Sequence, residues 1–395
     1  MPQNLETIAV PCSILRGGTS RGIFFSASDL PSERSAIAKI LTNILGSPDA
    51  RQINGLGGAT PQTSKVAIIS KSEHPEADVD YLFAQVDITS DLVDWGGNCG
   101  NISSAVGPYA INQGFVSANS DGSVTTVRIN NVNTGKIIDA QVPVFGSRAA
   151  IAGDTYIAGF SLPGARIELD FKSPTGAVTG KTLPTGNLRD LITLKDGREI
   201  EISVVDAANP TVFVKASSIG MTGLELPVEI EASPQILAVV EEIRGQVAVW
   251  LGLTEKAELA ASETPSLPKI GLMSAATDYK TSDSKTILKS QVDLVVRMFS
   301  IRSPHKACQI TAGICTGVAS LLPGTIVSDL MEVRASPTGR TEVRLGHPSG
   351  IMETVVHHAP RDTTEILKVS VVRTARAIMD GVVHVPAELF QVAMR

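Results

Sequence analysis

The sequence predicts an α+β protein with two similar lobes, each formed by a sheet wrapped around a central helix. Three observations support this fold class. The chain has 395 residues, which is enough for two domains or one large two-lobed unit. Short blocks recur in the same order in its two halves, as a duplicated unit produces. Each half also contains one apolar segment rich in small residues, which is typical of a tightly packed central helix.

The internal repeat consists of four matched blocks, each of which is weak by itself. The second pair begins with a lysine that opens an apolar strand pattern, Lys65 in one half and Lys269 in the other. The third pair aligns Asp80 with Asp293. The paired blocks are 24–28 with 213–217, 64–70 with 268–274, 78–83 with 291–296, and 133–137 with 348–351.

Three helices follow from composition and spacing. We expect central helices at residues 99–111 and 311–321, where frequent glycines lower helix propensity and make each helix depend on packing by strands. Residues 229–253 carry apolar side chains at helical spacing, which indicates an outer amphipathic helix.

Turn residues at 181–187 mark the expected boundary between the lobes. The first lobe is predicted to span residues 1–184 and to carry Lys65 and Cys99. The second lobe is predicted to span residues 185–395, with a last strand that can return to the first lobe. The sequence also allows a homodimer.

Composition and charge exclude several classes of protein. The net charge is −6 and no basic run occurs, so a nucleic-acid partner is not expected. No apolar run reaches the roughly 18 residues of a membrane span, and the first residues do not resemble a signal peptide. The cysteines form no Cys-x-x-Cys pair, which favours a reducing cytoplasm. They are Cys12, Cys99, Cys308 and Cys315.

The glycine-rich run at residues 96–101 leads into the first small-residue helix and places Cys99 at its amino terminus. Backbone N–H groups and the helix dipole favour a thiolate there and bind anions. The adjacent Asn98, Gly100 and Asn101 are therefore candidate ligand contacts, since the flanking glycines allow a close approach to the backbone. The structural alternative is a buried cysteine beside an asparagine cap.

A second candidate anion site is the turn at residues 16–22, which combines two arginines with hydroxyl groups and glycines. Arginine provides a bidentate fork for carboxylates, and the turn provides backbone donors. The spacing differs from that of a nucleotide-binding P-loop. A plain hairpin with solvated arginines is the alternative. The candidate contacts are Arg16, Gly18, Thr19, Ser20 and Arg21.

Lys65 follows Ser64 at the start of an apolar strand pattern. A lysine at a strand end beside a cleft can lose its proton through desolvation and act as a general base. Exposed lysines at strand ends are commoner, and the matching Lys269 suggests that the position is partly structural.

The second half offers further candidates near its small-residue helix. By the repeat, residues 311–313 take the place of Cys99, so the mirror position has no cysteine. The histidines show no metal-ligand spacing, and a metal centre is therefore not expected. The candidates in this half are His305, Thr311, Ala312, Gly313, Ser349 and Gly350.

Taken together, the motifs resemble those of the PrpF (methylaconitate isomerase) family over nearly the whole chain. This resemblance implies a diaminopimelate-epimerase-like fold with two pseudo-symmetric lobes and an active site between them. The motifs are 16–20 (RGGTS), 46–49 (GSPD), 63–66 (TSKV), 78–83 (DVDYLF), 98–101 (NCGN) and 347–350 (HPSG).

The resemblance also implies an activity. Family members are cofactor-independent isomerases of unsaturated di- and tricarboxylates, and we expect a tricarboxylate of the aconitate, methylaconitate or oxalomesaconate type. The reaction would be a 1,3-allylic proton transfer with double-bond migration or cis–trans isomerisation. By the resemblance, Lys65 and Cys99 are catalytic, and the 16–21 turn and both helix starts contact carboxylates.

Two departures from related enzymes bear on this expectation. Epimerases of the wider superfamily use one cysteine from each lobe, whereas Thr311 to Gly313 stand at the expected mirror position, which disfavours a two-thiol racemase or epimerase. Arg21 stands where many family members have lysine. A noncatalytic carboxylate-binding or accessory protein would need the anion sites but no reactive Lys65 and Cys99. A covalent thiol enzyme such as a hydrolase would need a histidine oriented on Cys99, and the sequence does not place one.

Overall fold

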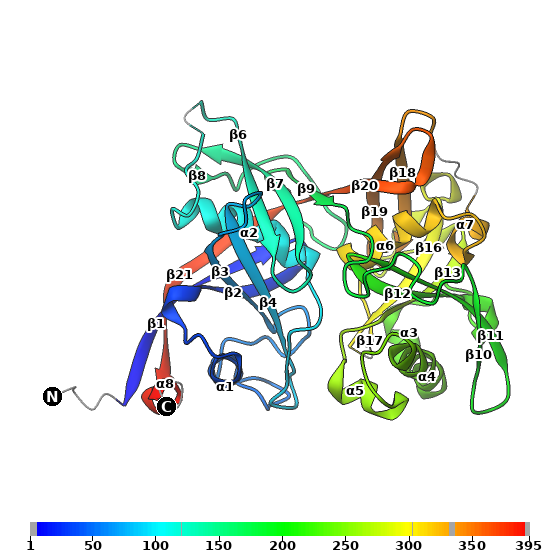
Figure 1. Cartoon of the computed structure of the whole chain (residues 1–395), viewed down its shortest axis with the longest axis horizontal. Coiled ribbons are helices and arrows are strands. Elements are labelled where there is room, and N and C mark those ends of the chain that lie inside the picture. The colour runs from blue at the N-terminus through cyan, green and yellow to red at the C-terminus, as the bar shows by residue number, and fades with distance from the viewer. Residues whose placement is uncertain (1–5, 120, 302, 332–335, 392–395) are drawn as a thin grey trace. The chain divides into compact units, whose positions relative to one another are not determined.

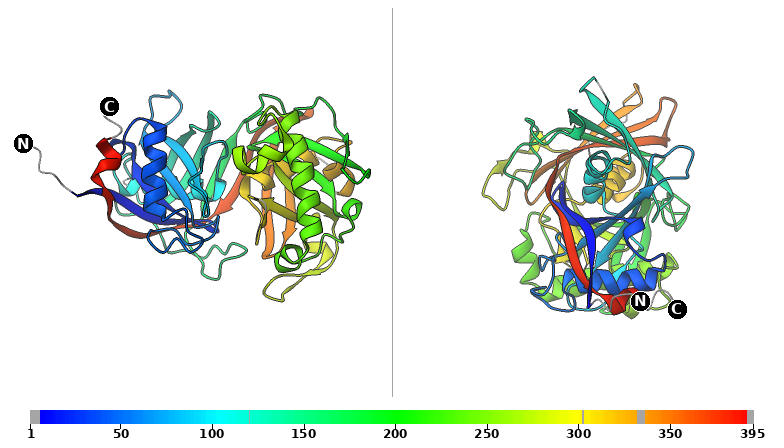
Figure 2. Two further views of the ribbon diagram at one scale, coloured as in Figure 1. Left: turned by 90° about the horizontal axis from the view of Figure 1, so that it is seen from below. Right: turned by 90° about the vertical axis from the view of Figure 1, so that its left-hand side faces the viewer.

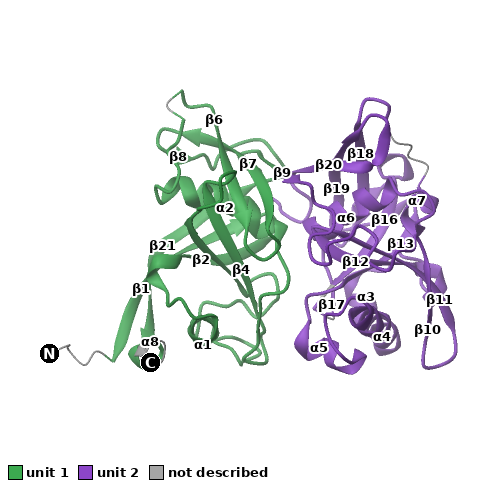
Figure 3. Ribbon diagram, viewed as in Figure 1, with its two compact units in different colours: residues 1–156, 162–169, 373–395 green, residues 157–161, 170–372 purple. Residues whose placement is uncertain are grey.

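A computed structural model describes residues 6–119, 121–301, 303–331 and 336–391 (Figure 1). The chain divides into two compact units (Figure 3). Unit 1 contains residues 1–156, 162–169 and 373–395, and unit 2 contains residues 157–161 and 170–372. After a short excursion into unit 2 at residues 157–161, the chain enters unit 2 at 169/170 and returns to unit 1 at 372/373. The sequence predicted the boundary between the lobes at 184/185.

Unit 1 is built on antiparallel pairs of consecutive strands, the two longer helices α1 and α2, and strand β21 from the end of the chain. Strand β1 pairs antiparallel with β2 and, on its other side, with β21, so the first and last strands lie side by side (Figure 1). Its elements are β1 (Thr7–Gly17), β2 (Ser20–Ser26), α1 (Arg34–Leu45), β3 (Lys65–Lys71), β4 (Val79–Val86), β5 (Val93–Asp94), α2 (Gly100–Asn112), β6 (Val124–Asn131), β7 (Lys136–Phe145), β8 (Arg148–Ala149), β21 (Ala375–Pro386) and α8 (Ala387–Gln391).

Unit 2 repeats this arrangement with additional short elements. Strands β9 (Ile167–Lys172) and β20 (Asp362–Arg373) carry the chain between the units. The other elements of unit 2 are β10 (Asp190–Thr193), β11 (Glu199–Ala207), β12 (Asn209–Lys215), α3 (Pro227–Glu231), α4 (Pro234–Trp250), α5 (Ala260–Glu263), β13 (Lys269–Ala275), β14 (Tyr279–Lys280), β15 (Thr286–Ile287), β16 (Leu294–Ser300), β17 (Ser303–Pro304), α6 (Ile310–Ser320), α7 (Ile326–Leu330), β18 (Arg340–His347) and β19 (Gly350–Ala359).

The two units share one pairing scheme, as the sequence repeat predicts. In unit 1 an antiparallel hairpin is followed by a parallel pairing of β2 with β3 and an antiparallel pairing of β3 with β4. In unit 2 the pairs β11–β12, β12–β13 and β13–β16 have the same directions in the same order. Lys65 and Lys269 both open the strand that pairs in parallel with its hairpin.

In the third block of the repeat, the residues that match in the structure differ by two positions from those that the sequence pairs. Asp78 binds Arg128 through both carboxylate oxygens, at 2.6 Å and 3.1 Å, and Asp293 binds Arg344 in the same way at 2.6 Å and 3.2 Å. The structural counterpart of Asp293 is therefore Asp78, whereas the repeat in the sequence predicts Asp80.

Helices α2 and α6 are the centres of the two units, and all residues of α6 and nearly all of α2 are buried. Small residues make this possible because strands approach the helices on several sides. A Cβ atom at Gly107 would lie 2.7 Å from Val142, and one at Gly317 would lie 3.0 Å from Thr354. The expected central helices are confirmed, and each of their four ends is shifted by one residue.

An outer helix covers the other face of the strands in each unit (Figure 2). In unit 1, Ile40 of α1 packs in one apolar cluster with Ile23 and Val66. In unit 2, Ile243 of α4 packs with Val212 and Ile270. Helix α4 is the outer helix predicted at residues 229–253, and α3 precedes it. None of the helices in the described ranges is long and apolar enough to span a membrane.

The packing of α2 predicts the effect of enlarging Gly107. We expect Gly107→Val to lower the free energy of unfolding by about 1–3 kcal/mol, because the added methyl groups must displace β6 and β7 side chains. The measurement is a denaturant titration. Gly381→Val in β21 is the control, since its Cβ would meet no atom closer than 3.5 Å. Equal unfolding midpoints for the two variants would contradict the tight packing of α2.

Candidate active site

Lys65 lies at the start of β3 between two partner strands. Its neighbours in register are Gly22 of β2 and Gln85 of β4. The half-buried Lys65 amine donates a hydrogen bond to Gln85 Oε1 at 2.5 Å, and its Nζ lies 5.2 Å from the centroid of the Phe83 ring. Within the described residues no carboxylate forms an ion pair with Lys65, so a neutral amide and an aromatic face surround this cation.

Cys99 is the N-cap residue of α2, as the sequence predicted. Its carbonyl oxygen accepts hydrogen bonds from Ser103 N at 2.9 Å and Ser103 Oγ at 3.1 Å. The Tyr81 hydroxyl lies 3.5 Å from the same oxygen. Burial raises the pKa of Tyr81 well above its ordinary value, with a smaller contribution from Cys99, so the hydroxyl stays protonated and can donate. The backbone of Cys99 is therefore held from two elements.

One face of β4 connects the two predicted catalytic residues. Tyr81, Phe83 and Gln85 occupy alternate positions of the strand, so their side chains share a face. Tyr81 reaches the backbone of Cys99, and Gln85 binds Lys65. The Tyr81 and Phe83 rings meet edge to face between them, with centroids 6.5 Å apart. Lys65 and the amino terminus of α2 thus belong to the same side of the unit 1 sheet.

The turn between β1 and β2 packs directly on the start of α2. Thr19 N and Thr19 Oγ1 are each 3.3 Å from a side-chain atom of Asn101, which accepts from the first and donates to the second. A Cβ atom at Gly17 would lie 2.3 Å from the carbonyl oxygen of Asn101, and Gly18 has a φ of 53°. These glycines therefore allow close packing of the turn on the helix. The sequence predicted that this turn would provide backbone donors for a carboxylate.

Arg16 is buried and bonded to the backbone, whereas a carboxylate ligand was expected. Its Nη1 donates to the carbonyl oxygens of Gly18 and Thr374, each at 2.9 Å. Burial lowers the pKa of Arg16, and the charge of Arg376 adds to this effect. Arg16 thereby ties the β1–β2 turn to the start of β21.

Arg21 differs from Arg16 although the two residues are register partners. No hydrogen bond or ion pair joins its guanidinium group to another described residue, and a Cβ atom at Gly58 would lie 2.9 Å from Arg21 Nη2. Because Gly22 is the partner of Lys65, the neighbouring Arg21 starts on the opposite face of the sheet. Arg21 remains at the same strand ends as Lys65. Of the two arginines, Arg16 donates to carbonyl oxygens of the chain, whereas the Arg21 guanidinium group has no acceptor among the described residues.

Ser64 is buried in a loop that supports β3. Its hydroxyl donates to Gln52 Oε1 at 2.8 Å and to the carbonyl oxygen of Thr60 at 3.0 Å. These bonds give Ser64 a structural contact where substrate binding was expected. Ser20, Asn98 and Gly100 are also buried, next to the turn and the helix start described above.

The counterpart of Cys99 in unit 2 is Gln309, the N-cap residue of α6. Thr311 Oγ1 accepts a hydrogen bond at 3.0 Å from Asn209, the first residue of β12, much as Asn101 contacts the β1–β2 turn. Thr311 therefore matches Asn101, and the prediction that residues 311–313 match Cys99 is wrong by two residues. The buried Cys308 immediately precedes the mirror position.

The remaining candidates in unit 2 make internal contacts. His305 Nδ1 accepts from Ala307 N at 3.0 Å, and the Ser349 hydroxyl donates to the carbonyl oxygen of Lys306. Gly350 accepts from the Tyr279 hydroxyl at 2.6 Å. Ala312 and Gly313 lie in the buried helix α6, and a Cβ atom at Gly313 would meet Met352 at 2.5 Å. The structure thus brings His305 and Ser349 to one loop region, around Lys306.

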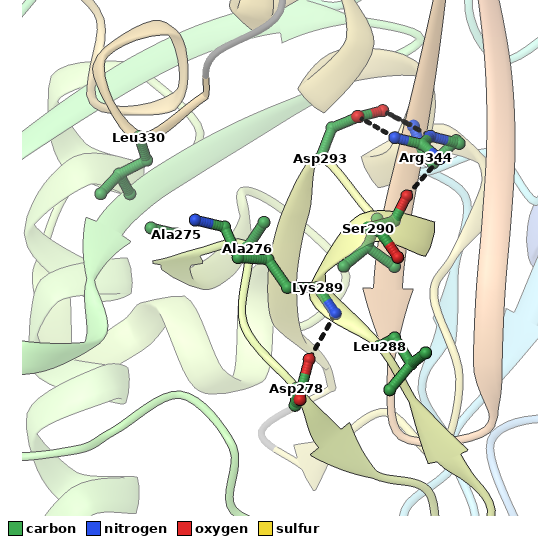
Figure 4. Close-up of a pocket in the computed structure, with 10 residues that line it drawn as sticks. Ala275, Ala276, Asp278, Leu288, Lys289, Ser290, Asp293, Leu330 and Arg344 are labelled. Carbon is green, nitrogen blue, oxygen red and sulfur yellow. Dashed lines mark hydrogen bonds and ion pairs between the residues drawn. The ribbon is translucent and has the colours of Figure 1, made fainter.

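A cavity of about 610 Å³ lies elsewhere in unit 2, outside these residues (Figure 4). Its wall contains the ion pair of Arg344 with Asp293, and Arg344 also donates to the carbonyl oxygen of Ser290 at 2.9 Å. Asp278 accepts from the backbone N of Lys289 at 2.6 Å. These charged groups therefore stabilise the local fold of unit 2. Across the described ranges no three His, Cys, Asp or Glu side chains cluster as metal ligands would.

The four cysteines differ in burial, which predicts their order of reaction. Cys12, Cys308 and Cys315 are buried, and Cys99 is partly exposed. Burial raises the pKa of Cys12 and raises that of Cys315 to about 12. We expect iodoacetamide to modify Cys99 first in the native protein, as measured by peptide mass spectrometry, and the other three only after unfolding. Earlier modification of Cys308 would contradict this order.

Solved structures share the fold of this chain. A crystal structure of a methylitaconate-delta-isomerase matches with a TM-score of 0.78 and 42% identity, covering 98% of this chain and 97% of that one. A hydroxyproline epimerase from Agrobacterium vitis matches with a TM-score of 0.53 and 9% identity, covering 96% and 93%, which indicates the fold alone. The predicted α+β, diaminopimelate-epimerase-like fold class is confirmed.

Sequence relatives identify the family. The 3-methylitaconate isomerase of Eubacterium barkeri is 44% identical, with 96% of this chain and 98% of the relative covered. The 2-methyl-aconitate isomerase of Cupriavidus necator is 38% identical, with 98% and 100% covered. The 4-oxalomesaconate tautomerase of Pseudomonas putida is 36% identical, with 95% of each covered. The family model described as PrpF protein matches residues 7–386, and the chain therefore belongs to the PrpF family.

Proposed function

We propose that this protein is an isomerase that moves a proton between two allylic carbons of an unsaturated di- or tricarboxylate. The observation that carries the proposal is the placement of Lys65 and Cys99 on one side of the unit 1 sheet, connected by the side chains of β4. Relatives that bear the names of isomerases of methylitaconate and methylaconitate support the same reaction class.

The reaction requires a base and a fixed positive potential. Removal of an allylic proton next to a carboxylate shifts negative charge onto a carboxylate oxygen. Lys65, as its amine, takes the proton from one allylic carbon while the C–H electrons form the new double bond. The old double bond opens, and its other end receives a proton from Lys65 or from the Cys99 thiol. Rotation in the delocalised intermediate gives a cis–trans isomer when the proton returns to its first carbon.

Positive potential at this site comes from two sources in unit 1. The amino terminus of α2 presents backbone N–H groups beside Cys99. Arg21 starts on the other face of the sheet at the same strand ends, and its guanidinium group has no acceptor among the described residues. We assign it to a substrate carboxylate that extends past these strand ends, whereas Arg16 supports the turn. The role of Thr311 and its neighbours as a further carboxylate site stays a prediction. No step of this scheme needs a metal or cofactor.

A two-thiol racemase or epimerase is the main alternative, and it would need an exposed thiol at the N-cap of α6. Gln309 stands there instead. A noncatalytic carboxylate-binding protein would bind these acids without exchanging their allylic protons. Incubation with methylitaconate, cis-aconitate and oxalomesaconate in deuterated water, followed by NMR, separates this alternative from the isomerase.

Removal of the proposed base should abolish most of the activity. We expect Lys65→Ala to lower kcat by at least about 100-fold, which is the usual contribution of a positioned base. The readout is isomerisation and deuterium incorporation by NMR. Lys71→Ala, at the exposed far end of the same strand, is the control and should keep the parental kcat. Near-parental turnover in folded Lys65→Ala protein would overturn the proposal.

The two arginines should respond differently to truncation. We expect Arg21→Ala to weaken inhibition by trans-aconitate by about 10- to 100-fold, because a charge-assisted hydrogen bond is lost, and to affect crotonate less. Arg16→Ala should instead lower the melting temperature, since the hydrogen bonds from its guanidinium group to the carbonyl oxygens of Gly18 and Thr374 are lost. Inhibition constants and thermal denaturation measure these effects. The reverse pattern would assign the carboxylate to Arg16.

A further inference from the structure

Gln85 is the only residue of the described chain that forms a hydrogen bond with the Lys65 side chain. The β3–β4 register places the two residues directly opposite each other. Gln85 is 4% exposed, so its amide has little contact with solvent. Neither the motifs nor the internal repeat had indicated a role for this glutamine.

The orientation of the Gln85 amide is determined by its other partners. Its Nε2 donates to the carbonyl oxygens of Ser64 at 2.9 Å and Pro61 at 3.2 Å. Carbonyl oxygens only accept hydrogen bonds, so the NH₂ end must face them and the oxygen must face Lys65. The loop before β3 therefore fixes Gln85, and Gln85 in turn fixes the position of the Lys65 Nζ atom.

The charge of this partner matters as much as its position. A carboxylate at the same place would stabilise the ammonium form of lysine and oppose its action as a base. The amide oxygen is neutral and accepts an N–H from either the ammonium or the amine. Phe83, on the same face of β4, contributes only an aromatic ring near Nζ. Lys65 is thus anchored by a group that does not hold it in the protonated state.

We propose that Gln85 is a positioning residue that aims the Lys65 amine at the substrate and, because it is neutral, allows that amine to accept a proton. This inference rests on the proposed role of Lys65 as the base. It assigns no contact between Gln85 and the substrate.

The decisive test is the pH profile of Gln85→Glu. A carboxylate beside Nζ favours the ammonium, so the pH at which the rate is half-maximal should be about 1–3 units higher in this variant than in the parent protein, with kcat recovered at high pH. Gln141→Glu, which adds the same charge on β7, is the control and should keep the parental profile. A Gln85→Glu profile that matches the parent overturns the inference.

A second variant and a second readout keep the test decisive if Gln85→Glu folds poorly. Gln85→Met keeps the side-chain length and loses the acceptor, so kcat should fall about 10-fold or more while KM changes little. Reductive methylation with labelled formaldehyde then allows the titration of Lys65 to be followed by NMR without any turnover. Unchanged kcat in folded Gln85→Met protein contradicts the positioning role.

The two proposals fail in different ways. Normal turnover in folded Lys65→Ala protein would show that Lys65 is not the base, and Gln85 would then have no base to position. Loss of turnover in Lys65→Ala, together with parental pH profiles for both Gln85 variants, leaves the base in place and removes only the role of Gln85.

Discussion

The burial of one helix inside each unit is the constraint on which the rest of the structure depends. Helices α2 and α6 are covered on all sides, so strands must approach them closely and only small residues are tolerated at Gly107 and Gly317. This packing leaves the helix amino terminus at the strand ends, next to the hairpin turn. Thr19 with Asn101, and Asn209 with Thr311, secure that position in the two units.

The residues around this helix start fall into two groups, those that support the fold and the candidate reacting groups. Arg16, Ser64 and Asn101 bond mainly to turns and loops, and so they hold the framework on which Lys65 and Cys99 stand. Tyr81 and Gln85 extend from one strand to these two residues. A strand face of alternating side chains is a rigid way to set the spacing of two reacting groups.

The two units share a structural ion pair but differ at the amino terminus of their central helices. The ion pair of Asp78 with Arg128 recurs as Asp293 with Arg344, with nearly the same geometry. The N-cap position, in contrast, holds Cys99 in unit 1 and Gln309 in unit 2. The structural ion pair thus recurs in both units, whereas the N-cap of the central helix carries a thiol in unit 1 and an amide in unit 2.

The sequence by itself determined the fold class, the duplication, the buried helices and the positions of Lys65 and Cys99, because periodicity, glycine content and strand-end motifs are local signals. Only the tertiary structure decided what Arg16, Ser64 and Gln85 contact, and which residue of α6 matches Cys99. Hydrogen bonds between residues distant along the chain decide these points. Arg16 reaches Thr374 across 358 positions, and Gln85 faces Lys65 through strand register, which no local pattern encodes.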